Sequence, residues 1–123
     1  MDTSVFIARE AGRSLDLDAL PVEVLVSVVT VAELRAGVLV ADSPEQAARR
    51  LASLEEARQT APLPIDDDVA EHWASLRVAL RQAGRRMGVN DAWIASTALA
   101  HGLAVVTQDR DYAAVLGLTV VRV

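Results

Sequence analysis

The sequence has 123 residues, 52% hydrophobic and 24% charged, with a formal net charge of −5; this predicts one folded domain over residues 1–123 and excludes wholesale disorder. The absence of cysteine excludes disulfides and thiolate metal sites, and two histidines, His72 and His101, are too few for a histidine-built zinc site. Without a long apolar run or a basic leader, we expect a cytoplasmic protein that has no membrane segment.

The first third of the chain is predicted to contain a strand followed by a helix. Residues 2–4 resemble a strand-to-helix junction, although only Met1 precedes them. The β-branched run over residues 22–29 predicts a buried strand. Thr30 and Glu33 then have the spacing of a capping box, which predicts a helix over residues 31–40.

The rest of the chain alternates between helical and extended patterns. These patterns predict a helix over 43–59 capped by Ser43, an extended piece over 63–65, a helix that Asp67 caps and Gly84 ends, a helix from Asn90 to Gly102, a strand over 104–107, a short helix over 110–116 and a strand over 118–123. Strands separated by helices indicate βαβ units, and therefore an α/β fold with a mainly parallel sheet. Ligands of such sheets bind beyond the carboxyl ends of the strands.

Four acidic residues stand near the ends of predicted elements: Asp2 at the first strand-to-helix junction, Glu33 and Asp91 in the first turns of helices, and Asp109 two residues past a strand. Each has a structural explanation of its own, because Glu33 can complete a capping box, Asp91 can favour a helix N-terminus and Asp109 can stand in a turn. Together, however, all four can face one rim of a parallel sheet. We therefore expect one acidic site there.

Converging carboxylates need a counter-charge. Two like charges about 4 Å apart repel by roughly 4 kcal/mol at an effective dielectric of 20. Carboxylate oxygens favour hard divalent cations, so Mg²⁺ or Mn²⁺ is expected rather than zinc. Such a site supports phosphodiester hydrolysis.

Four segments resemble the motifs of PIN-domain ribonucleases, specifically the VapC toxins of bacterial toxin–antitoxin pairs. They are Asp2–Ile7, Thr30–Gly37, Asn90–Ala95 and Val106–Tyr112. The resemblance covers nearly the whole chain. It implies a PIN-like three-layer α/β/α fold with a central mainly parallel sheet, and a Mg²⁺-dependent endoribonuclease that inhibits translation and growth.

The resemblance also implies the site and its partners. The catalytic set would be Asp2, Glu33, Asp91 and Asp109, with Asp2, Asp91 and Asp109 as metal ligands. Ser4 and Thr107 would be supporting hydroxyls, and Asn90 and Asp111 would surround the ligands or cap helices. The implied partners are structured RNA such as tRNA, a VapB-type antitoxin whose C-terminal segment crosses and inhibits the site, and a second copy in a homodimer.

The start of the chain departs from the family pattern, because VapC chains usually carry a few apolar residues before the first aspartate. Either translation starts upstream of Met1, or the chain omits residues, or the first strand is truncated. A truncated strand is expected to loosen the position of Asp2.

Arginine supplies all 12 basic residues. Arg77, Arg81 and Arg85 are spaced by four along one predicted helix, with Arg86 beside them and Arg35 near Glu33. These five are candidates for binding RNA phosphates. A solvated helix face explains the helical group equally well, and the sequence leaves both interpretations open.

Two other functions fit parts of the pattern. A catalytically silent PIN-like module would bind RNA or protein without cleaving it, although all four acids are present. A phosphotransfer protein such as a receiver domain would pair a nucleophilic aspartate with a lysine, and the sequence contains no lysine.

Overall fold

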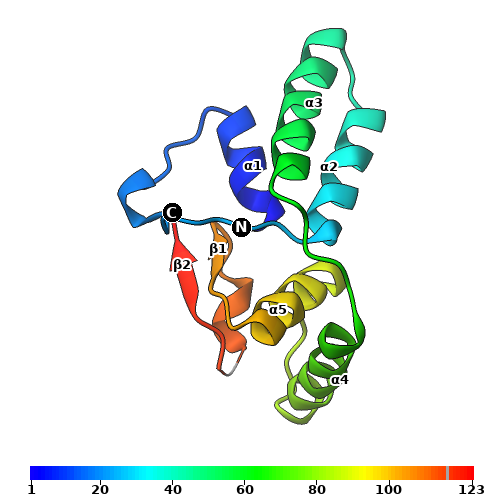
Figure 1. Cartoon of the computed structure of the whole chain (residues 1–123), viewed down its shortest axis with the longest axis vertical. Coiled ribbons are helices and arrows are strands. Elements are labelled where there is room, and N and C mark those ends of the chain that lie inside the picture. The colour runs from blue at the N-terminus through cyan, green and yellow to red at the C-terminus, as the bar shows by residue number, and fades with distance from the viewer. Residues whose placement is uncertain (116) are drawn as a thin grey trace.

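The computed structural model describes residues 1–115 and 117–123 (Figure 1). Its elements are α1 (Thr3–Glu10), η1 (Leu17–Ala19), α2 (Val28–Leu39), α3 (Pro44–Gln59), α4 (Asp67–Gln82), α5 (Val89–His101), β1 (Val105–Thr107), η2 (Asp111–Ala114) and β2 (Val120–Arg122). The helices α2 and α3 form one antiparallel pair, and α4 and α5 lie on the other side of the chain start. Within the described residues, no helix has both the length and the apolar character to cross a bilayer.

The sheet is parallel, as expected, but smaller than the sequence predicts. Strand β1 pairs with β2 in the register Val105↔Val120. The final strand covers only 120–122 of the predicted 118–123. The short helix predicted over 110–116 is the 3-10 helix η2, and its expected end at Leu116 lies outside the described residues.

The prediction of a strand over residues 22–29 is wrong. Helix α2 takes the end of this run, because the Ser27 hydroxyl accepts a hydrogen bond from the Val29 backbone N–H at 3.0 Å and caps the helix. The remainder makes one parallel bridge, between Ser27 and Leu63. Side-chain capping and helix packing thus outweigh the β preference of the valines.

The predicted capping box of Thr30 and Glu33 is also wrong, because α2 begins before Thr30. Thr30 lies inside α2 and is fully buried, so it cannot cap the helix. Glu33 therefore does not form the capping box that its spacing suggested.

The other helix boundaries follow the sequence closely. Ser43 caps α3 by accepting a hydrogen bond from the Gln46 backbone N–H at 3.1 Å. The cap of α4 is Asp66 rather than Asp67, since Asp66 Oδ1 accepts from the Val69 backbone N–H at 3.0 Å. Gly102 ends α5 in the left-handed conformation, with φ of 65°.

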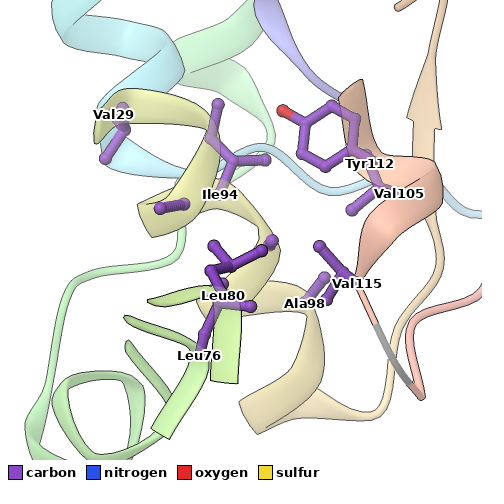
Figure 2. Packing of buried hydrophobic residues seen from close by; sticks show 10 residues of the cluster. Val29, Leu76, Leu80, Ile94, Ala98, Val105, Tyr112 and Val115 are labelled. Atoms are coloured by element: carbon purple, nitrogen blue, oxygen red, sulfur yellow. The ribbon is translucent and has the colours of Figure 1, made fainter. Parts of the chain in front are cut away.

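Two apolar clusters flank the start of the chain. One joins α4, α5, β1 and η2 around Leu80, Ile94, Val105 and Tyr112 (Figure 2). The other joins α1, α2 and α3 around Phe6, Leu34 and Leu54. An Arg9–Glu56 ion pair also ties α1 to α3.

Backbone hydrogen bonds fix the first two residues between these clusters. The Asp2 N–H donates to the Val106 carbonyl of β1 at 2.9 Å, and the Met1 amino group donates to the Leu25 carbonyl at 2.8 Å. The expected loosening of Asp2 is not observed, because Asp2 is 1% exposed.

The assignment of Ser27 as the cap of α2 can be tested by mutation. Ser27→Ala is expected to lower the free energy of unfolding by about 1 kcal/mol, because a helix donor loses its acceptor. Ser75→Ala, on the exposed face of α4, is the matched control and should change stability by less than about 0.5 kcal/mol. Equal denaturation midpoints for the two variants would contradict the assignment.

Candidate metal centre

Three carboxylates from distant parts of the sequence meet in one pocket. Asp2 precedes α1, Asp91 lies in the first turn of α5, and Asp109 follows β1. One oxygen of each lies within 4.8 Å of the others. They line a pocket of about 280 Å³, which Glu33 also lines.

Asp2 is the most tightly held of the three. Its Oδ1 accepts hydrogen bonds from the Ser4 backbone N–H at 3.1 Å and the Ser4 hydroxyl at 2.6 Å. Its Oδ2 accepts from the Thr107 hydroxyl at 2.7 Å. These donors fix the rotamer of a buried carboxylate and offset the loss of its hydration.

The same hydroxyls also hold the loop that carries Asp109. Ser4 Oγ accepts from the Gln108 backbone N–H at 2.9 Å, and Thr107 Oγ1 accepts from the Asp109 backbone N–H at 2.9 Å. The structure therefore places Ser4 and Thr107, both predicted as supporting residues, as direct partners of Asp2.

Asp91 is oriented by a residue that the sequence did not single out for the site. The Tyr112 hydroxyl donates to Asp91 Oδ1 at 3.2 Å. The Tyr112 side chain is fully buried, with its ring at one end of the apolar cluster (Figure 2). Burial raises the pKa of Tyr112, so its hydroxyl remains a proton donor. The signal in the sequence that could have found it is the aromatic position that ends the Val106–Tyr112 segment.

Glu33 lies at the pocket but outside the group of three. Its Oε1 accepts a hydrogen bond from the Thr3 hydroxyl at 2.7 Å. The structure thus separates Glu33 from the three clustered aspartates and leaves it facing the same space.

Neither Asn90 nor Asp111 is one of the three clustered aspartates, although Asp111 lies close enough for its charge to raise the pKa of Asp91 and Asp109. Asn90 is exposed in the first turn of α5, whose cap position is Gly88, and no side chain caps that helix. Asp111 is exposed at the start of η2, which also has no side-chain cap. The capping role predicted for these two residues is wrong.

Crowding changes the proton affinity of the two less buried ligand candidates. Burial raises the pKa of Asp91, and the charges of Asp2 and Asp109 raise it further, while the hydrogen bond from Tyr112 opposes the rise. Burial and Asp2 likewise raise the pKa of Asp109, against the opposing charge of Arg13. Burial is the largest cause of the raised pKa in both carboxyls, and the neighbouring like charges add to it.

The donor set fits a hard divalent cation. It consists of carboxylate oxygens, and their repulsion would be relieved by a bound positive charge. Neither histidine lines this pocket. Asp2, Asp91 and Asp109 are therefore the residues that could hold the ion.

The arginine candidates fall into two groups. Arg77, Arg81, Arg85 and Arg86 line one groove of about 660 Å³ between the end of α4 and the start of α5. Arg35 is exposed on α2 and lines neither this groove nor the metal pocket.

The profile of the family described as PIN domain matches residues 1–117. The chain belongs to the PIN-domain family. Among similar proteins, Ribonuclease VapC5 of Mycobacterium tuberculosis is 50% identical over 123 residues, which covers all of this PIN-domain chain and 91% of the relative. Ribonuclease VapC4 of the same organism is 52% identical over 123 residues, which covers 99% of this chain and 94% of the relative. This PIN domain is therefore a member of the VapC ribonuclease group.

Solved structures agree with this membership. The VapBC-5 toxin–antitoxin structure from M. tuberculosis contains a chain with a TM-score of 0.91 and 47% identity to this PIN domain, covering 99% of this chain and 95% of that one. The FitAcB structure from Neisseria gonorrhoeae contains a chain that matches with a TM-score of 0.77 and 30% identity, covering 98% of this chain and 94% of that one. The predicted PIN-like α/β fold is confirmed.

Metal binding by the three aspartates predicts a thermal shift. Saturating Mg²⁺ or Mn²⁺ should raise the Tm of the wild type, since an ion at about 100 times its Kd stabilises the folded state by about 2.7 kcal/mol. Asp91→Asn should abolish the shift. Asp67→Asn, which removes one exposed acid at the start of α4, is the matched control and should retain it. An equal shift in both variants would contradict the assignment.

Proposed function

We propose that this protein is the toxin of a VapBC-type pair, a cytoplasmic, metal-dependent endoribonuclease that cleaves structured RNA such as tRNA and thereby inhibits translation and growth. The observation that carries the proposal is the meeting of Asp2, Asp91 and Asp109 within 4.8 Å. Membership in the VapC ribonuclease group supports it independently.

The division of labour within the pocket follows from the contacts of each acid. Asp2, Asp91 and Asp109 would hold Mg²⁺, or Mn²⁺ in its place, and such an ion would supply a water of lowered pKa and stabilise the leaving oxygen. Glu33 lies outside the three and is oriented by Thr3. Its carboxylate is the group that accepts a proton from the attacking water.

The net charge of −5 does not oppose RNA binding, because much of it is concentrated in the acidic pocket. The arginine-lined groove supplies the complementary surface. Val89 and Ala92 form one wall of this groove, and Asp91 lies between them in sequence and lines the metal pocket. An RNA strand bound in the groove would thus pass the first turn of α5 on its way to the metal.

The tryptophans of this region are structural. Trp73 stacks on Trp93 with ring centroids 4.6 Å apart, and the Arg77 guanidinium lies over the Trp73 ring, 5.1 Å from its centroid. The Trp73 indole already contacts the Trp93 ring and the Arg77 guanidinium, so it is poorly placed to stack on an RNA base. Phosphate contacts by Arg81, Arg85 and Arg86 are the interaction that this groove offers.

A VapB-type antitoxin is the proposed inhibitor, since the similar VapBC-5 structure belongs to a toxin–antitoxin family. A second groove between α1 and α2 shares Thr3, Ile7 and Glu33 with the metal pocket. It is flanked by the exposed apolar side chains Ile7 and Val40, 47% and 70% exposed. A bound segment there would continue into the site. Homodimerisation, which the resemblance implies, is tested by light scattering of the isolated protein.

The cleavage proposal is tested with RNA, Mg²⁺ and EDTA. Wild-type protein should cleave in Mg²⁺ and stop in EDTA. Asp91→Asn should lower kcat by roughly a hundredfold or more, because one metal ligand loses its charge, whereas Asp67→Asn should leave kcat unchanged. Equal cleavage by wild type and Asp91→Asn would contradict the proposal. Binding without cleavage by either would identify a silent PIN-like module instead.

The groove proposal predicts a change in salt dependence. Arg81→Gln combined with Arg85→Gln should weaken RNA binding and reduce the slope of log K against log salt by about 0.7 for each phosphate that is no longer neutralised. The matched control is Arg49→Gln combined with Arg58→Gln on the exposed face of α3. An unchanged slope in the groove variant would favour a solvated helix face.

A further inference from the structure

Arg13 is the one basic side chain among the described residues that line the metal pocket. It shares this pocket with Asp2, Glu33, Asp91 and Asp109. No resemblance or spacing pattern pointed to it, because it lies in a loop after α1 rather than at a strand end.

The chain reversal after α1 determines where Arg13 lies. Gly12 adopts the left-handed conformation with φ of 68°, and its N–H donates to the Arg9 carbonyl at 3.1 Å. The Arg13 N–H then donates to the Ala8 carbonyl at 2.9 Å. This pair of hydrogen bonds is the Schellman arrangement, which turns the chain sharply at a helix end.

A second contact ties this turn to the loop of the metal ligands. Gln108 Nε2 donates to the Ser14 carbonyl at 3.2 Å and to the Val123 carbonyl at 3.0 Å. Gln108 directly precedes Asp109, and its own N–H is held by Ser4. The backbone next to Arg13 is therefore fastened to the same loop that positions a candidate metal ligand.

The Arg13 guanidinium is not paired with a carboxylate of the described residues. Among the described residues, the ion pair within 4.0 Å is Arg9–Glu56, and Arg13 forms none despite the acids around it. Its exposed side chain stands at the pocket rim. Once a cation neutralises the three aspartates, Glu33 is the carboxylate left in the pocket and is held by Thr3, so Arg13 can pair with an anionic group that enters with the substrate.

We propose that Arg13 binds a nonbridging oxygen of the scissile phosphodiester, an inference that rests on the proposed ribonuclease activity. Guanidinium matches phosphate oxygens with two parallel N–H donors, and it keeps its charge at any physiological pH. In the hydrolysis, the water oxygen forms a bond to phosphorus while a P–O ester bond breaks, the water proton passes to Glu33, and the leaving oxygen takes a proton from solvent. The phosphorus centre gains negative charge on the way, and Arg13 stabilises that charge.

The test compares Arg13→Gln and Arg13→Lys with Arg110→Gln. Arg110 is exposed and follows Asp109 directly, but it does not line the pocket. Arg110→Gln therefore removes the same charge as Arg13→Gln and serves as its control. Arg13→Gln is expected to lower kcat by about a hundredfold, with a smaller change in KM. Arg13→Lys should recover part of the loss, because it restores charge without the two-pronged geometry. Arg110→Gln should behave as wild type.

A binding measurement with Ca²⁺ in place of Mg²⁺ separates the contact from the chemistry. Arg13→Gln should raise the Kd of a short single-stranded RNA several-fold and flatten its salt dependence, while the Mg²⁺-induced shift in Tm persists. If Arg13 only balances the acidic pocket, Arg13→Gln will bind Mg²⁺ more tightly and keep its RNA affinity and kcat. That result would overturn the inference.

The two proposals can fail separately. If the wild type cleaves RNA and Arg13→Gln matches Arg110→Gln in kcat and in RNA affinity, the role of Arg13 is overturned and the ribonuclease stands. If the wild type binds RNA without cleaving it and Arg13→Gln binds it more weakly, the ribonuclease is overturned and the phosphate contact stands. If the wild type neither binds nor cleaves RNA, both are overturned.

Discussion

Electrostatic repulsion among three carboxylates is the constraint around which this protein is organised. Asp2, Asp91 and Asp109 approach within 4.8 Å, and one of them is almost completely buried. Water cannot solvate a carboxylate in that position, so hydroxyl and backbone donors do so instead. Ser4 and Thr107 supply them to Asp2, and Tyr112 supplies one to Asp91. The remaining charge is what a divalent cation would neutralise.

The site lies where the two apolar clusters meet. Phe6 anchors α1 in one cluster, whereas Ile94, Val105 and Tyr112 belong to the other, from which Asp91 and Asp109 extend. The hydrogen bond from the Asp2 N–H to the Val106 carbonyl joins the two halves. Stability and function are therefore coupled, because the packing of both clusters positions the ligands.

The sequence predicts the helices well because their ends carry local signals. Ser43 and Gly102 fix helix ends through side-chain capping and left-handed backbone, which depend on neighbouring residues alone. The run over residues 22–29 misleads because its β-branched residues fit a strand equally well, whereas in the structure Ser27, inside this run, caps α2 and begins a helix. The pocket was predicted from four acids placed at one rim of a parallel sheet, but in the structure only Asp109 among the clustered aspartates follows a strand, while Asp2 precedes α1 and Asp91 lies in the first turn of α5. Arg13 was not predictable, since a chain reversal places it there, and Tyr112 was signalled only as the aromatic end of the Val106–Tyr112 segment, without its hydrogen bond to Asp91.

The most direct test of the central claim is anomalous diffraction from crystals of the wild-type protein soaked in Mn²⁺. The account predicts one or two anomalous peaks in the pocket, within coordination distance of the carboxylate oxygens of Asp2, Asp91 and Asp109. The peaks should disappear in Asp91→Asn crystals soaked in the same way. Manganese bound only at other acidic surfaces, such as Asp66–Asp68 at the start of α4, with an empty pocket, would contradict it.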